Sequence, residues 1–134
     1  MRGQAATRNL LPSEEYGVGG YDTVRGYKER EVNGDSAFVA NFELTHSPVA
    51  LSRMFGIESA IDSLQLLAFL DYGAAFIHQA APGQKKNYHL YSGGPGLRYK
   101  IGPWVSVRTD WGFQLHPVAG GPRQRLHFQA IASY

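Results

Sequence analysis

The sequence predicts an all-β protein, a sheet of about five antiparallel strands that belongs to a transmembrane β-barrel. Apolar and polar residues alternate in five segments, each bounded by Gly, Pro, Asn or Ser. Each segment has about ten residues or more, whereas soluble strands usually have five or six, and a tilted strand of about ten residues crosses a bilayer. Short and long connections alternate between the segments, as they do in membrane barrels.

The five segments are expected at residues 36–45, 64–76, 88–101, 104–115 and 123–134. Successive side chains of a strand point to opposite faces, so Phe42 and Glu43 stand on different faces of the first segment, as do Leu70 and Asp71 in the second. The third segment lies between Asn87 and Gly102. The side chains expected to contact lipid are Phe38, Phe42, Leu66, Leu70, Val105, Val107, Trp111, Leu126 and Phe128.

The connections support the barrel with one exception. Gly102-Pro103 is a tight turn, whereas 77–87 and 116–122 are longer and polar or rich in Gly and Pro. The exception is 47–63, whose apolar residues predict a helical turn or a segment at the membrane interface. The smallest spanning barrels need eight strands. We therefore expect a piece of a larger sheet, with Gln4 ending an earlier strand and further sequence before Met1.

Composition excludes several classes of function. The net charge is +2 with Lys and Arg spread along the chain, which argues against nucleic acid as a partner. Cysteine is absent, so disulfides and thiolate metal sites are excluded, and the five His are too scattered for a metal site. Asp71 and Asp110 could serve as an acid/base pair, but nothing in the sequence shifts the pKa of one carboxyl group relative to the other. We expect no catalytic residue, no metal and no cofactor.

Arg25 is the strongest candidate for a functional residue. It follows Gly19-Gly20, a pair that permits a tight turn, and its guanidinium requires a partner. Glu43 and Asp71 lie on the polar faces of their strands, and the residues between Arg25 and the first strand reach roughly 36 Å when extended. A carboxylate can bind a guanidinium through two parallel hydrogen bonds. The competing interpretation is a solvated Arg25 and an ordinary charged Asp71.

The order of several motifs resembles a known family. They are Leu11-Pro12-Ser13-Glu14-Glu15-Tyr16-Gly17-Val18-Gly19-Gly20, Val24-Arg25-Gly26-Tyr27, Phe69-Leu70-Asp71-Tyr72-Gly73, Gly94-Pro95-Gly96-Leu97-Arg98-Tyr99 and the 125–134 ending. Together they resemble the C-terminal barrel of two-partner secretion transporters, the haemolysin activation/secretion (ShlB/FhaC/HecB) family of the BamA-type outer-membrane superfamily. The resemblance covers nearly the whole chain.

The resemblance implies an integral protein of the bacterial outer membrane that secretes a partner exoprotein. Residues 1–35 would hold the end of an earlier strand and a loop inserted in the lumen, and 36–134 the last five strands. The functional loop and its lock would be Val24, Arg25, Gly26, Tyr27, Glu43, Phe69, Asp71 and Gly73. Phe128 and Tyr134 would form a signal for the outer-membrane assembly machinery.

Two alternatives stay open at this point. A barrel that inserts other outer-membrane proteins, of the BamA type, shares the arginine loop and the Phe-x-Asp strand. A soluble β-sandwich would alternate in the same way. Partition between detergent and aqueous buffer separates the sandwich from both barrels.

Overall fold

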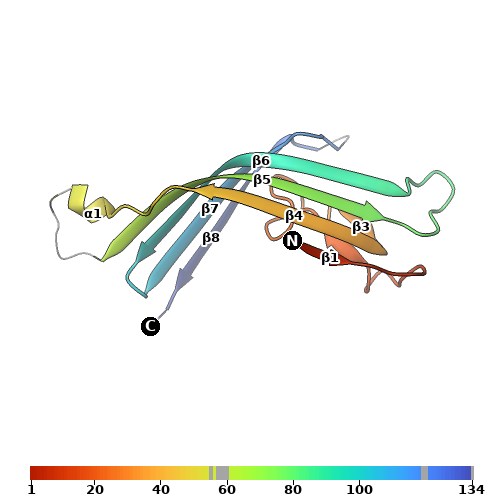
Figure 1. The fold of residues 1–134 in the computed structure, drawn as a ribbon, viewed down its shortest axis with the longest axis horizontal. Coiled ribbons are helices and arrows are strands. Elements are labelled where there is room, and N and C mark those ends of the chain that lie inside the picture. Colours follow the sequence, from red (N-terminus) through yellow and green to blue (C-terminus); the bar gives the residue numbers. More distant parts are fainter. Residues whose placement is uncertain (55, 57–60, 119–120, 134) are drawn as a thin grey trace.

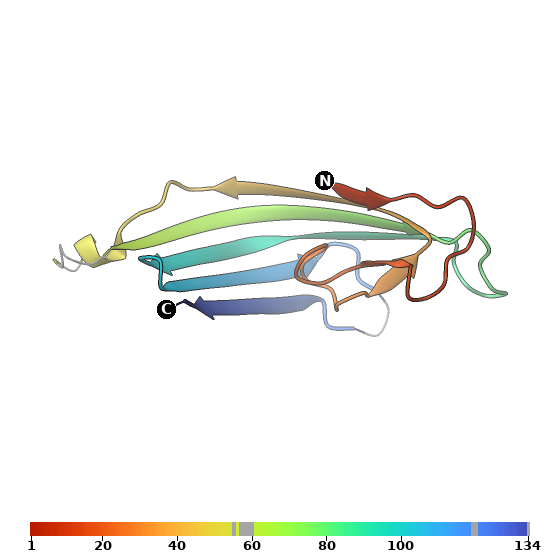
Figure 2. The same cartoon turned by 90° about the horizontal axis from the view of Figure 1, so that it is seen from below.

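The computed structural model describes residues 1–54, 56, 61–118 and 121–133. Their strands form a six-stranded antiparallel sheet in the order β1-β4-β5-β6-β7-β8 and a two-stranded sheet of β2 and β3. The elements are β1 (Arg2–Gln4), β2 (Tyr16–Val18), β3 (Val32–Gly34), β4 (Ser36–Thr45), α1 (Leu51–Met54), β5 (Asp62–Phe76), β6 (Asn87–Ile101), β7 (Val105–Gln114) and β8 (Gln124–Ala132). The large sheet is arched and open, with β2 and β3 on its concave side (Figures 1 and 2). The predicted all-β fold is confirmed.

The strands follow the predicted segments within a few residues. β4 has the predicted bounds, whereas β5 and β6 begin earlier, at Asp62 and Asn87. Their ends are set by backbone pairing, which runs without a break from Asp62 opposite Ile101 to Phe76 opposite Asn87. β7 and β8 are slightly shorter than the alternation predicts, because the ladder between them ends with Val105 opposite Ala132 and Phe113 opposite Gln124.

The two faces of the sheet differ as the alternation predicts. Phe42 lies opposite Leu70, and both are more than half exposed on the convex face. Asn41 lies opposite Asp71 on the concave face, where Asp71 is buried. The other predicted lipid contacts Phe38, Leu66, Trp111, Leu126 and Phe128 are exposed, and Val105 and Val107 are half-buried. The convex face is therefore apolar and the concave face carries the charges.

The connection between β4 and β5 contains the one described helix. The backbone N–H groups of Leu51 and Ser52 donate to the Asp62 carboxylate, which holds the start of α1 against the first residue of β5. This connection lies at the same end of the sheet as the tight turn at Gly102, where φ is +52°. Among the described residues, no helix is long and apolar enough to cross a membrane.

Residues 5–35, called here the inserted loop, join β1 to β4. Strand β1 ends at Gln4 and pairs with β4. The β2–β3 hairpin was not predicted, because three residues per strand are too few for an alternation to be visible. Val18, Val24 and Tyr27 of the loop are fully buried, and they share one core with the sheet residues Val39, Ala75 and Leu90. Apolar packing therefore fixes the loop on the concave face.

Candidate functional site: an arginine held inside the sheet

The turn before Arg25 is closed by the predicted glycine pair. Gly19 and Gly20 have φ values of +113° and +105°, which residues with a Cβ rarely adopt. The Gly20 N–H donates to the Val24 carbonyl at 3.0 Å, and the Gly19 N–H donates to Thr23 Oγ1 at 2.8 Å. These bonds reverse the chain and direct the next residues toward the wall.

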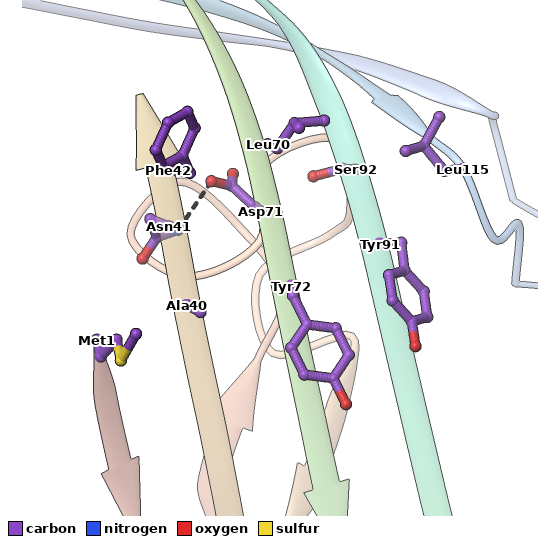
Figure 3. Close-up of a pocket in the computed structure, with 10 residues that line it drawn as sticks. All are labelled: Met1, Ala40, Asn41, Phe42, Leu70, Asp71, Tyr72, Tyr91, Ser92 and Leu115. Atoms are coloured by element: carbon purple, nitrogen blue, oxygen red, sulfur yellow. Dashed lines mark hydrogen bonds between the residues drawn. The ribbon is translucent and has the colours of Figure 1, made fainter. Parts of the chain in front are cut away.

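Arg25 and Asp71 form a bidentate ion pair on the concave face. Arg25 Nε donates to Asp71 Oδ2 and Nη2 donates to Oδ1, both at 2.8 Å, and the Arg25 backbone N–H adds a third bond at 3.1 Å. The Arg25 side chain is 3% exposed and that of Asp71 is fully buried. Asn41, on the neighbouring strand, donates to Asp71 Oδ1 at 2.9 Å (Figure 3). Every oxygen of the carboxylate is thus engaged.

Glu43 and Phe69 complete the surroundings of the guanidinium. Arg25 Nη1 donates to Glu43 Oε1 at 2.6 Å. The Arg25 Cζ atom lies 3.7 Å from the centroid of the Phe69 ring, a cation–π distance. We call Arg25, Glu43, Phe69 and Asp71 the arginine lock. Burial by itself lowers the pKa of Arg25, but the hydrogen bonds and charge of Asp71 raise it above its ordinary value, so the group stays a cation.

A further carboxylate stands behind the lock. Asp110 on β7 is fully buried, and its Oδ2 lies 3.5 Å from Arg25 Nη1. Arg98 binds Asp110 through both terminal nitrogens, at 2.6 and 3.1 Å, and Arg108 Nε donates to it at 2.9 Å. Three arginines therefore face the three carboxylates of Glu43, Asp71 and Asp110. Since the charges match, the cluster is neutral despite its burial.

The residue after Arg25 contacts the wall through its backbone. The Gly26 N–H donates to His127 Nε2 at 3.1 Å, and Gln114 Nε2 donates to the Gly26 carbonyl at 2.8 Å. Gly112 on β7 faces Gly26 directly, and a Cβ on Gly26 would lie 2.9 Å from the Gly112 carbonyl carbon. No side chain separates the two backbones here, which explains why both positions are glycine.

The remaining predicted site residues seat the loop against the wall. Tyr27 Oη lies 2.7 Å from the His116 carbonyl oxygen and 2.9 Å from that of Tyr91, and the two carbonyls share its single proton. Val24 packs over Gly73, where an added Cβ would lie 2.6 Å from Val24 Cγ2. Gly73 thus provides the space that the loop occupies.

The structure brings together eight of the ten predicted site residues. Val24, Arg25, Gly26, Tyr27, Glu43, Phe69, Asp71 and Gly73 all lie in or against the lock. Phe128 lies apart from it, exposed on the convex face of β8, and Tyr134 lies outside the described residues. The prediction missed Arg98, Arg108, Gly112 and His127. The sequence gives Asp110 no role, whereas in the structure Arg98 and Arg108 bind it.

No metal centre is evident in the part of the chain that the structure describes. Within those residues no three His, Asp or Glu side chains are grouped as metal ligands. An apolar hollow does lie on the convex face, lined by Ala40, Phe42, Leu70, Tyr72, Tyr91 and Leu115 (Figure 3). It is separated from the lock by the sheet itself, since Phe42 and Leu70 alternate with the inward Asn41 and Asp71.

An arched sheet with an apolar convex face, and a loop locked by a buried arginine on its concave face, define the wall of a membrane β-barrel with an inserted loop. The model of the family described as haemolysin secretion/activation protein ShlB/FhaC/HecB matches residues 1–99, and the chain belongs to this family. Its members are outer-membrane protein transporters. No curated protein and no solved structure matches the chain.

Proposed function

We propose that this chain forms the closing part of an outer-membrane barrel that secretes a partner exoprotein, and that the inserted loop is the gate of the pore. The arginine lock carries this proposal. A bidentate ion pair between Arg25 and Asp71, both nearly or fully buried, holds the loop at the wall through charge and geometry together. Secretion then depends on a loop that the lock positions at the wall and that the arriving exoprotein displaces, so a loop that has lost the lock is no longer placed to be displaced and secretion fails.

The proposed roles of the other parts follow from the two faces. The convex side chains such as Leu70 and Phe128 would face lipid, because burying them elsewhere would require a second layer on that face. β8 carries Leu126, Phe128 and Ala130 on this face and is the last strand of the sheet among the described residues. We propose that this strand is the part of the chain that the outer-membrane assembly machinery binds, by adding it to an exposed strand edge.

The test replaces Arg25 in the transporter expressed from its own gene. Removing one partner of a desolvated ion pair costs about 3–5 kcal/mol, so Arg25→Ala should reduce secretion of the exoprotein severely while folded barrel remains in the membrane. Arg25→Lys keeps the charge but loses the two parallel bonds, and should also be defective. Lys28→Ala, an exposed change in the same loop, is the matched control.

The same experiment separates the BamA-type alternative. If the protein assembles other outer-membrane proteins, Arg25→Ala lowers the amounts of those proteins in the membrane. Secretion of the exoprotein then falls by no more than those amounts do. Normal secretion by Arg25→Ala, at equal barrel level, would refute the gate.

A further inference from the structure

Tyr21 of the inserted loop contacts strands β7 and β8, whereas the lock lies on β4 and β5. Arg108 Cζ lies 4.1 Å from the centroid of the Tyr21 ring, and Tyr21 Oη donates to Gln129 Oε1 at 2.9 Å. The ring centroid of His127 is 5.8 Å away. Arg108 lies on β7, and Gln129 and His127 lie on β8, whereas Asp71 of the lock lies on β5. Tyr21 therefore attaches the inserted loop to β7 and β8 in addition to the contacts made by the lock, Gly26 and Tyr27.

Asp110 links the Tyr21 contact to the lock. Its Oδ2 accepts a hydrogen bond from Arg108 Nε at 2.9 Å and lies 3.5 Å from Arg25 Nη1. Arg108 is thereby fixed in the orientation that places its guanidinium over Tyr21. Arg98 binds the same carboxylate, so that Asp110 keeps a counter-charge even when Arg25 is absent.

The loop and the wall exchange roles between the two cation–π contacts. At the lock, the loop supplies the cation and the wall supplies the ring, since Arg25 stacks on Phe69. At the second place the wall supplies the cation and the loop supplies the ring. Two cation–π contacts on different strands thus add to the hydrogen bonds of Gly26 and Tyr27 in fixing the orientation of the loop.

We propose that Tyr21 is a second anchor of the inserted loop, a positioning residue that acts through Arg108 and Asp110. The inference rests on the proposed gating function and adds an order of opening to it. The Arg108 side chain is 30% exposed and that of Arg25 only 3%, so water competes for the second anchor far more than for the lock. The second anchor opens first, and its release lets the loop tilt before the lock breaks.

The test measures how often the inserted loop leaves the concave face of the sheet and exposes the residues beneath it. The chain has no cysteine, and Ser92 is buried on the concave face with no hydrogen-bond partner for its Oγ among the described residues. Ser92→Cys is thus the one cysteine of this part of the chain and costs no hydrogen bond, and the parent protein without it gives the background labelling. Maleimide labelling of intact cells then reports loop opening, and heat-modifiability of the barrel reports assembly.

Tyr21→Leu removes the ring from Arg108 and should raise the labelling rate roughly fivefold to thirtyfold, the range of a partly desolvated cation–π contact. Arg108→Gln should have an effect at least as large, because it also removes the hydrogen bond to Asp110. Since both changes break the contact between Tyr21 and Arg108, the double variant should exceed Arg108→Gln by no more than about twofold. Tyr21→Phe keeps the ring and should change labelling less than Tyr21→Leu. Arg123→Gln, at an exposed arginine, is the control for charge.

Two outcomes would refute the second anchor without refuting the gate. In the first, Arg25→Ala raises the labelling rate but Tyr21→Leu leaves it unchanged. In the second, the effects of Tyr21→Leu and Arg108→Gln on the labelling rate are fully additive. If Arg25→Ala also fails to raise labelling, the gate itself is refuted. If Tyr21→Leu does not assemble, the comparison of Tyr21→Phe with Arg108→Gln decides, because equal labelling in both would overturn the anchor.

Discussion

Gly73→Ala is expected to push the inserted loop off the wall without changing any charge. The added Cβ would lie 2.6 Å from Val24 Cγ2 and closer still to Val18 Cγ1, whereas carbon atoms pack best at about 3.5–4.0 Å. Each valine must therefore retreat by about 1 Å. Both valines are fully buried in the core beneath the loop, and overpacking of this kind typically costs about 1–3 kcal/mol.

The assay compares exoprotein secretion and labelling of Ser92→Cys at equal barrel level. Gly73→Ala should lower secretion and raise labelling, and adding Val18→Ala, which removes the closest methyl group, should restore both in part. Gly121→Ala is the control, since the nearest atom to its added Cβ is 4.0 Å away. Unchanged labelling in Gly73→Ala, or a double variant no better than the single one, would refute the steric reasoning.

Three further predictions concern the faces, the acid response and the end of the chain. Leu70→Arg, on the convex face, should destabilise the membrane-inserted barrel by about 2–4 kcal/mol, whereas Gln65→Arg, on the concave face of the same strand, should be mild; equal unfolding midpoints in urea would contradict the assigned faces. The backbone N–H groups of His78 and Leu10 donate to Asp35 and hold its pKa below the ordinary 3.8. Because the folded state therefore binds fewer protons than the unfolded state, the stability that Asp35 contributes is present above pH 3.8. This stability is lost as the pH falls through the lowered pKa. Asp35→Asn should flatten this part of a stability profile measured between pH 6 and about 2; an unaltered profile would show that Asp35 is not responsible. Tyr134→Asp should reduce heat-modifiable barrel in the outer membrane far more than Ser133→Asp, and equal barrel levels would mean that the terminal aromatic is not an assembly signal.

The strands were predictable because alternation is a local property. The residues of β4 alternate from Ser36 to Thr45, and the strand has those bounds. The extra residues of β5 were not visible, because Asp62 and Ser63 carry no apolar pattern and are recruited by pairing with Ile101 and Lys100. Strand length there is decided by the partner strand.

The sequence predicts those site residues that a local pattern marks, either alternation within a strand or a glycine turn in the loop. Asp71 and Glu43 stand out as inward charges, and Arg25 stands out by its glycine turn. Tyr21 and His127 have no such signal, since their contact depends on how far the loop reaches across the sheet. Asp110 had a usable signal, since it is an inward carboxylate on the strand after Arg98, but the sequence assigns it no partner.

The burial of the arginine lock makes the attachment of the loop insensitive to salt. Dissolved ions screen charges that water reaches, with a Debye length near 8 Å at physiological salt, and they screen buried pairs much less. With Arg25 at 3% exposure and Asp71 at zero, the ion pair between them should hold equally well in dilute and in salty surroundings. If the loop gates secretion as proposed, its release depends on contact with the exoprotein and not on ionic strength.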